Sequence, residues 1–253
     1  MFNVITIITA SALAVLGFIS GPLGCKVLNK IPASWLCDYD ETPSEDILSG
    51  KRFVSKRTGI IMGVITAAAM FAATLIMGVS GELPCIVLIY IFLLLISASD
   101  AKYTIIPDQF TVAVAVLSLI FAVIDYFTVK NFITSWYAPL LGAAFGGAVL
   151  LVLDLFSTLV FKKAGFGFGD VKLMAALGLM LGLKYTIVLL VMSSFVAAFH
   201  FLFLIFSGKA KKGIYLPMGP YICLGTVFTM LLQPKFESVF YMYKMLTEMD
   251  VLP

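Results

Sequence analysis

The stretch FGFGDVKLMAALG, residues 166–178, places an acidic side chain at the entrance of an apolar run. Gly165, Gly167 and Gly169 precede Asp170, and the residues after it are apolar apart from Lys172. Glycine tolerates positive φ and lets a second backbone approach without a Cβ in the way. A carboxylate at the start of an apolar membrane helix is costly, and such groups usually serve a function. The fold therefore depends on whether this run is a membrane helix.

The composition of the whole chain answers that question. Hydrophobic residues make up 61% of its 253 residues and charged residues only 12%, against about 45–50% and about 25% in soluble domains. Apolar runs recur along the whole length, at roughly 2–20, 59–79, 84–99, 110–127, 136–161, 171–183, 185–206 and 214–232. We therefore expect an all-α fold, a polytopic integral membrane protein with about eight transmembrane helices.

The basic residues predict how these helices are oriented, because short cytoplasmic loops carry an excess of Lys and Arg. Alternate loops hold thirteen of the seventeen basic residues, and the remaining loops and the tail hold only Lys130, Lys184, Lys235 and Lys244. Both termini should therefore lie outside, in a cell inner membrane whose cytoplasmic face carries the basic loops. The net charge of +3 reflects this topology and not a nucleic-acid surface, because the basic residues form no continuous stripe.

One segment is polar enough to be a sizeable loop. We expect residues 1–24 to form the first span, residues 25–58 a cytoplasmic loop, and residues 59–253 the membrane domain. The two cysteines of the loop, Cys25 and Cys37, are twelve residues apart without any Cys-x-x-Cys pair. No metal site is therefore predicted, and cytoplasmic thiols should stay reduced. The loop also carries an acidic cluster, which consists of Asp38, Asp40, Glu41, Glu45 and Asp46.

Two acidic residues far apart in the sequence are expected to reach the same membrane face. Asp100 ends the third span in LLLISASDAKYTIIPDQF, and Asp170 begins the sixth, both on the cytoplasmic side. The sixth run would make a helix of only about 20 Å against a hydrocarbon core of about 30 Å. The glycine loop should then dip below the membrane interface and carry Asp170 with it, inside protein or a wet cavity. This is the arrangement that a carboxylate pair needs.

Such a pair can hydrolyse a peptide bond. One ionised carboxylate takes a proton from water as the water attacks the carbonyl, while its protonated partner donates to the carbonyl oxygen. Two carboxylates a few ångströms apart cannot both ionise. The helix macrodipole favours the ionised form of Asp170 at a helix N-terminus and the protonated form of Asp100 at a helix C-terminus. Because a coupled pair shares its protons, this assignment is a hypothesis.

Other acidic residues have simpler interpretations. Asp108 stands at the start of the fourth span, and we expect an N-cap there rather than a catalyst. Asp170 taken alone is equally well explained as a cap. Asp125 and Glu82 stand at the external ends of spans, where we expect them to be solvated.

Four residues inside spans complete the candidates. Asp154 lies about two turns inside the fifth span, where it is protonated, paired or faces a cleft, and the sequence favours none of these. His200 lies mid-span among phenylalanines, and we expect a neutral packed imidazole rather than a ligand. Gly142 and Gly146 are expected to allow close helix packing.

Taken together, these motifs resemble those of the type IV prepilin peptidase family of membrane aspartic proteases. SASDAKYTIIPD, residues 97–108, is similar to the first aspartate motif of the family, and GFGFGDVKLMAALG, residues 165–178, to its Gly-x-Gly-Asp motif. LPMGPYICLG, residues 216–225, resembles its Pro-x-Gly-Pro segment, and GPLGCKVLNKIP, residues 21–32, the stretch after its first span. The resemblance covers nearly the whole chain, with the same order and spacing.

The resemblance implies an activity and its residues. The catalytic pair of the family falls on Asp100 and Asp170. Its members cleave the short basic leader from type IV prepilins and pseudopilin-like precursors, after a glycine and on the cytoplasmic side. The implied partners are these precursors and the lipid bilayer, with no nucleic acid. Supporting or substrate-binding positions fall on Gly167, Gly169, Asp108, Pro217, Gly219 and Pro220.

The first loop departs from the family pattern. Many bacterial members also methylate the new amino terminus with S-adenosylmethionine and carry two Cys-x-x-Cys pairs in this loop. This chain has only Cys25 and Cys37 there, so a zinc-stabilised loop is not expected and the methyltransferase activity is in doubt. Proteolysis itself needs no cofactor. The acidic cluster either attracts the basic leader of the substrate or is simply solvated.

Two rival interpretations remain open. An ion-coupled membrane transporter would use intramembrane acids such as Asp154 to bind a cation. It does not explain why Asp100 and Asp170 lie at the same membrane face beside a glycine-rich loop, and no inverted repeat is apparent. An intramembrane protease of the presenilin type shares Gly-x-Gly-Asp, but it would show Pro-Ala-Leu where this chain has PMGP, residues 217–220.

Overall fold

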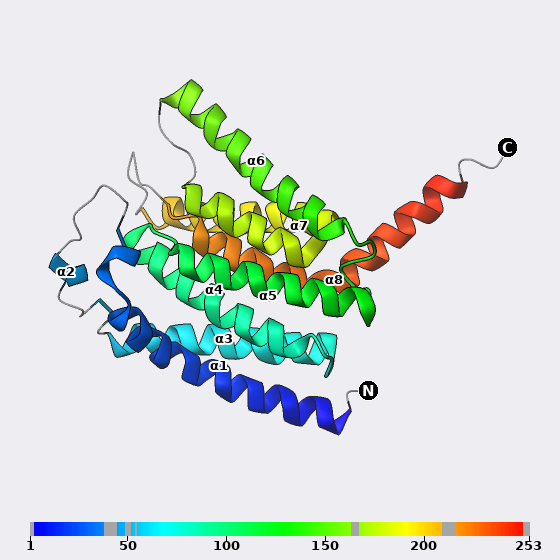
Figure 1. Ribbon diagram of the computed structural model, residues 1–253, viewed down its shortest axis with the longest axis horizontal. Helices are drawn as coiled ribbons and strands as arrows, with labels where there is room; N and C mark the ends of the chain where they lie inside the picture. Colours follow the sequence, from blue (N-terminus) through cyan, green and yellow to red (C-terminus); the bar gives the residue numbers. More distant parts are fainter. Residues whose placement is uncertain are drawn as a thin grey trace.

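Helices make up the regular structure of the chain (Figure 1). The computed structural model describes residues 3–37, 45–48, 52–53, 55–162, 167–208 and 216–249, without the side chains of residues 46, 161, 239 and 242–249. No strand occurs among these residues, so the predicted all-α fold is confirmed. The helices in chain order are α1 (Val4–Lys30), the 3-10 helix η1 (Ala33–Trp35), α2 (Glu45–Leu48), α3 (Lys56–Met77), α4 (Leu83–Tyr103), α5 (Asp108–Phe127), α6 (Ala138–Phe161), α7 (Phe168–Phe206) and α8 (Gly219–Met249).

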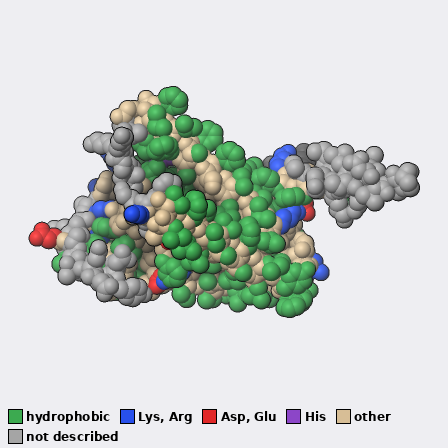
Figure 2. All heavy atoms as spheres, turned by 90° about the horizontal axis from the view of Figure 1, so that it is seen from above, with side chains coloured by type: hydrophobic (Ala, Val, Ile, Leu, Met, Phe, Trp, Pro, Cys, Tyr) green, Lys and Arg blue, Asp and Glu red, His purple; other side chains and the backbone are tan. Residues whose placement is uncertain are grey.

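The long helices have the surface of a membrane protein. Six of the described helices, α1 and α3 to α7, are long and apolar enough to cross a membrane. Large apolar side chains such as Leu159 and Phe199 are 72% exposed, and hydrophobic side chains cover the middle of the face in Figure 2 while charged ones gather near its two ends. The chain is therefore a polytopic membrane protein. The count of eight spans stays a prediction.

The start of α1 and the end of α8 lie at the same end of the bundle (Figure 1). We call this the terminal end, and the opposite end, where α7 begins, the Asp170 end. The arrangement agrees with an even number of crossings. The outside location of the termini stays a prediction, because the structure contains no membrane.

α7 doubles back on itself at Gly182. Its φ of +64° and ψ of 176° interrupt the helix, in a conformation that suits glycine. A Cβ placed on Gly146 of α6 would lie 3.0 Å from side-chain atoms of both Met174 and Thr186. A continuous helix would separate those two residues by about 18 Å. The two halves of α7 therefore run antiparallel, and they correspond to the sixth and seventh predicted runs.

Glycines let α6 pack closely on the two halves of α7. A Cβ on Gly142 would lie 2.2 Å from the carbonyl oxygen of Gly178, and a Cβ on Gly178 would lie 2.4 Å from that of Gly142. No side chain fits at such distances. The packing role predicted for Gly142 and Gly146 is confirmed.

α4 is the central helix of the bundle. It is the most buried of the candidate spans, and it contacts α1, α3, α5 and α8. Its buried residues continue to its last turn, where they include Ser99 and Asp100. This position brings the end of α4 within reach of the start of α8.

The first loop folds onto the helix ends at the Asp170 end. α1 continues to Lys30, six residues beyond the end predicted for the first span. Arg52 is 5% exposed, and its guanidinium donates to the carbonyl oxygens of Leu28, Ile31 and Ile47 at 2.8–3.0 Å. A basic residue that the sequence assigns to a solvated loop therefore holds this loop on the bundle. The division of the chain into residues 1–24, 25–58 and 59–253 stays a prediction.

Most of the acidic cluster of this loop falls outside the described residues. This applies to Asp38, Asp40 and Glu41 and to the side chain of Asp46, whereas Glu45 is exposed. All four cysteines of the chain are free thiols. Within the part of the chain that is described, no three His, Cys, Asp or Glu side chains come together as metal ligands would.

Two acids at the terminal end contradict the sequence prediction. Asp125 is fully buried and Glu82 is 1% exposed, although both were expected to be solvated. The α5–α6 loop folds back over Asp125, whose carboxylate accepts the backbone N–H groups of residues 131–133 at 2.6–3.0 Å. The Thr128 hydroxyl donates to Glu82 at 3.1 Å. Burial is tolerated because these donors replace water.

Candidate active site

Asp100 lies in the last turn of α4, with its side chain 5% exposed. Thr104 caps the helix after Tyr103: it adopts the left-handed conformation at φ +57° and donates its N–H to the Asp100 carbonyl at 2.8 Å. The carboxylate Oδ2 of Asp100 accepts the backbone N–H of Gly219, the first residue of α8, at 2.8 Å. The chain thus positions Asp100 between the end of one helix and the start of another.

Asp170 lies in the first turn of α7 and is 4% exposed. Gly167 is the N-cap of this helix, and its N–H donates to Asp170 Oδ2 at 3.1 Å. The predicted capping role is therefore present, but it uses only one oxygen. Oδ1 of Asp170 is buried and has no hydrogen-bond partner among the described residues. A buried polar atom without a partner is costly, so capping alone does not explain this carboxylate.

The fold brings Asp100 and Asp170 together. The two carboxylates are close enough for their charges to interact. Cys223 on α8, itself 4% exposed, lies within electrostatic range of both of them. The ends of α4, α7 and α8 therefore converge on one buried site, as the sequence predicted for the two aspartates.

The α4–α5 connection holds the start of α7 in place. A Cβ on Gly169 would lie 3.0 Å from Cβ of Ile106, so a side chain at Gly169 would push this loop away. Lys172 on α7 forms an ion pair with Asp108 at 2.8 Å. The N-cap prediction for Asp108 is wrong by one residue, because Pro107 is the N-cap of α5 and Asp108 is its first residue. Asp108 instead contacts α7.

The segment before α8 places a glycine against Asp100. A Cβ on Gly219 would lie 2.7 Å from Asp100 Oδ2 and 3.0 Å from its Cγ, which no side chain allows. Pro217 precedes the helix and Pro220 is its second residue, where a missing N–H costs nothing. Of these three predicted positions, only Gly219 is seen to contact a carboxylate.

His200 and Tyr221 form a polar pair that the sequence analysis did not find. Nδ1 of His200 lies 2.5 Å from the Tyr221 hydroxyl, and the His200 side chain is exposed rather than packed as predicted. Tyr221 is 6% exposed and interacts electrostatically with Asp100. The signal available in the sequence was the position of Tyr221 two residues after Gly219.

Asp154, the acid predicted to lie inside a span, is half-buried on α6.

Comparisons with known proteins point to one family. Residues 87–202 match the model of the type IV leader peptidase family. The chain is 29% identical over 169 residues to the prepilin leader peptidase/N-methyltransferase of Bacillus subtilis (strain 168), which covers 66% of this chain and 63% of the relative. No solved structure gives a significant match.

Two further relatives carry the same name. The protein of Xanthomonas campestris pv. campestris is 34% identical over 134 residues, 53% of this chain and 44% of its own length. That of Aeromonas hydrophila is 31% identical over 144 residues, 57% of this chain and 47% of its own length. The chain thus spans about half the length of these relatives, and none of the matches supports a transporter. Residues 87–202, which contain Asp100 and Asp170, are therefore similar to the type IV leader peptidase family.

Proposed function

We propose that this protein is a membrane-embedded aspartic endopeptidase whose catalytic residues are Asp100 and Asp170. The observation that supports the proposal most directly is the state of Asp170. Its carboxylate is buried beside Asp100, and one oxygen has no partner among the described residues. That oxygen is available to a water molecule. A carboxylate that takes a proton from water must offer such an oxygen to the water.

The two aspartates divide the chemistry between them. Asp170, at a helix N-terminus, is the ionised partner, and Asp100, at a helix C-terminus, holds the shared proton. Asp170 takes a proton from water as the water oxygen bonds to the scissile carbonyl carbon, and Asp100 gives its proton to the carbonyl oxygen. The tetrahedral intermediate then collapses, the C–N bond breaks, and the leaving nitrogen takes the proton held by Asp170. The hydroxyl proton returns to Asp100.

The proposed substrates are type IV prepilins or pseudopilin-like precursors, cut after a glycine between a short basic leader and an apolar helix. The names of the relatives support this class. The proposed location is the inner membrane, with the active site facing the cytoplasm. Basic residues at the Asp170 end, such as Arg52, Lys102 and Lys172, support this orientation.

The test is co-expression of the full chain with a pilin-like precursor, followed by loss of the leader on a gel. We expect wild type to cleave the precursor. Asp100→Asn and Asp170→Asn should each cleave it about 10²–10⁴-fold more slowly. Both variants should remain in the membrane at normal levels, because the amide keeps the shape of the side chain. Normal maturation by either variant would overturn the assignment.

Methylation is a separate question, because the relatives are also named N-methyltransferases. The first loop of this chain lacks paired cysteines, so we propose that the new amino terminus stays unmethylated. The residues described here give no set to which S-adenosylmethionine can be assigned. Mass spectrometry of the processed terminus tests this, and one added methyl group that depends on S-adenosylmethionine would contradict it.

A further inference from the structure

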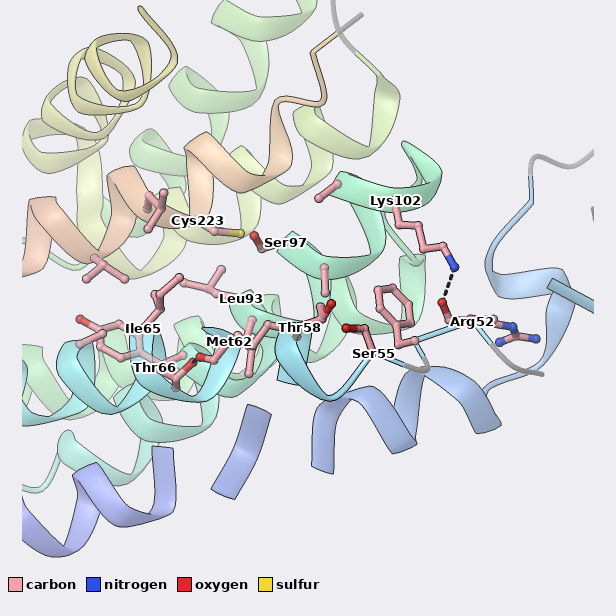
Figure 3. A pocket seen from close by; sticks show the side chains of 18 residues that line it. Arg52, Ser55, Thr58, Met62, Ile65, Thr66, Leu93, Ser97, Lys102 and Cys223 are labelled. Atoms are coloured by element: carbon pink, nitrogen blue, oxygen red, sulfur yellow. Dashed lines mark hydrogen bonds between the residues drawn. The ribbon is translucent and has the colours of Figure 1, made fainter. Parts of the chain in front are cut away.

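A groove lies between α3, α4 and α8 (Figure 3). Its volume is about 570 Å³, within the about 300–1,000 Å³ of ligand pockets. α4 supplies its floor from Tyr90 to Lys102, and α3 and the first turns of α8 supply its walls. α3 and α8 both pack on α4 but contact each other little. Ile65 lines the groove and is 49% exposed, so the groove opens sideways toward the bilayer.

One end of the groove lies next to the turn of α4 that carries Asp100, although neither aspartate lines it. Ser97 and Ala101 line it on either side of Asp100 in the sequence of α4. Cys223 lines it from α8, one turn after Gly219, and lies within electrostatic range of both carboxylates. A molecule bound in the groove would therefore have one end near the two aspartates.

The lining suits a helix better than a lipid chain. Small side chains at α3 and α4 allow the backbone of another helix to approach closely, and those that line the groove are Thr58, Thr66, Ala69, Ser97, Ala98 and Ala101. Tyr90 also lines it and is 3% exposed, and its hydroxyl has no hydrogen-bond partner among the described residues. A bound peptide could supply that partner, whereas an acyl chain could not.

The charges of the groove are at its mouth. Lys102 lines the end nearest Asp100, and the deeper lining is uncharged. Arg52 also lines this end, but its guanidinium is bound by backbone carbonyl groups and points away from the groove (Figure 3). An uncharged segment can therefore enter, whereas a basic leader is disfavoured and stays outside. From Ala101 to Tyr90, α4 rises about 17 Å, which corresponds to about three turns of a bound helix.

We propose that this groove binds the apolar segment that follows the scissile bond of the substrate, as a helix packed along α3, α4 and α8. The inference rests on the proposed function, and it assigns the specificity surface of the same site. The segment enters sideways from the bilayer, and its first residue stops at Asp100 and Asp170. Only about its first three turns are in contact with the enzyme.

The first test is photo-crosslinking in the Asp100→Asn chain, so that the precursor is bound but not cut. A photoreactive amino acid replaces either Ile65 in the groove or the adjacent Val64, which is 53% exposed and does not line it. We expect adducts with the precursor from position 65 only, at substrate residues within the first three turns and with helical spacing. Equal adducts from both positions, or adducts with lipid alone from position 65, would overturn the proposal.

The second test measures cleavage with Ile65→Trp and the matched control Val64→Trp. A tryptophan at position 65 fills the groove, so we expect KM for the precursor to rise about tenfold or more, with kcat little changed. The control should cleave like wild type. If wild type cleaves and the two variants do not differ, the groove is not the binding surface. If wild type does not cleave although position 65 crosslinks the precursor, the proposed function fails and the groove assignment stands.

Discussion

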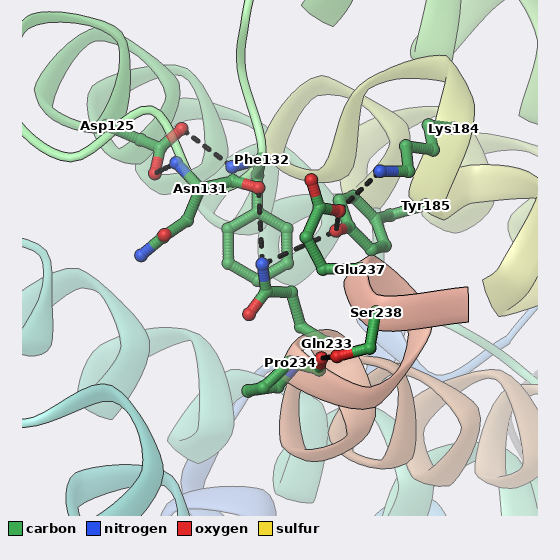
Figure 4. Close-up of polar contacts among 9 residues, drawn as sticks. All are labelled: Asp125, Asn131, Phe132, Lys184, Tyr185, Gln233, Pro234, Glu237 and Ser238. Carbon is green, nitrogen blue, oxygen red and sulfur yellow. Dashed lines mark hydrogen bonds and ion pairs between the residues drawn. The ribbon is translucent and has the colours of Figure 1, made fainter. Parts of the chain in front are cut away.

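The bundle buries carboxylates at both of its ends, and their surroundings differ. At the terminal end, Asp125 accepts three backbone N–H groups from residues 131–133. Gln233 contacts the Asn131 carbonyl oxygen and the Tyr185 hydroxyl at 3.4 Å, and that hydroxyl donates to Glu237 at 2.5 Å (Figure 4). The carboxylates of Asp125 and Glu237 thus both accept hydrogen bonds from the described residues.

At the Asp170 end the carboxylates are less well satisfied. Asp100 and Asp170 each accept one backbone N–H, from Gly219 and Gly167. Oδ1 of Asp170 accepts none from the described residues, although it is buried. Burial alone therefore does not identify a reactive acid. Asp125 has the donors of a structural anchor, whereas one buried oxygen of Asp170 accepts no hydrogen bond from the described residues.

The largest effect on stability is expected from Asp125→Ala. It leaves three backbone N–H groups without their acceptor, each at a cost of about 1–3 kcal/mol when no water reaches it. Because the loop can partly rehydrate, we expect the free energy of unfolding in detergent to fall by about 2–4 kcal/mol, measured by denaturant titration. Asp125→Asn keeps a carbonyl acceptor and should lose less. Full stability of Asp125→Ala would show that this network is not an anchor.

Gly219→Ala should impair catalysis more than folding. The new Cβ would lie 2.7 Å from Asp100 Oδ2, so the carboxylate must move, and a displacement of this kind lowers kcat by about 10–100-fold. Gly167→Ala is the matched control, because its Cβ would lie at an ordinary 3.5 Å from Asp170 Oδ2. Kinetics of precursor cleavage compare the two. Equal rates in both variants would remove the role assigned to Gly219.

The ion pair between Asp108 and Lys172 should have a smaller effect. The two side chains are 38% and 35% exposed, and exposed pairs contribute about 0–1 kcal/mol. We expect Lys172→Met to lower the cleavage rate by no more than about fivefold. The exchanged pair Asp108→Lys with Lys172→Asp should recover part of the loss. If Lys172→Met lost cleavage as completely as Asp170→Asn, the pair of Asp108 and Lys172 would instead belong to the catalytic machinery.

The smallest effect is expected from Glu82→Gln, and it concerns pH. Burial raises the pKa of the Glu82 carboxyl, the charge of Asp125 adds to the rise, and the hydrogen bond from Thr128 opposes it. The folded state therefore binds this proton more tightly than the unfolded state. Its contribution to stability is complete at low pH and is lost as the pH rises through the pKa of the folded state. Thermal melting against pH should show a weaker loss in Glu82→Gln than in wild type.

The sequence predicted much of the architecture, because apolar runs and glycines carry local information. The break between the runs that end at residue 183 and begin at residue 185 corresponds to the reversal at Gly182. The positions at which the apolar runs begin and end were enough to predict that Asp100 and Asp170 lie at the same end of the bundle. The contacts of Gly142 and Gly146 followed from their lack of a side chain.

The remaining features depend on contacts between distant segments. Glu82 and Asp125 were expected in water because they end apolar runs, but a loop covers Asp125. Arg52 counts as a loop charge in the sequence, yet three carbonyl groups bind it. His200 was expected to pack, and it binds Tyr221 on another helix instead. No local pattern encodes these pairings.

The most direct test of the central claim compares Asp170→Asn with Asp125→Ala, each purified as folded protein at the same concentration. We expect Asp170→Asn to melt at or above the wild-type temperature and to cleave no precursor. Asp125→Ala should melt at a lower temperature and cleave, per folded molecule, within about twofold of wild type. Cleavage by Asp170→Asn at the wild-type rate, or loss of cleavage by folded Asp125→Ala, would contradict the distinction between a reactive and a structural carboxylate.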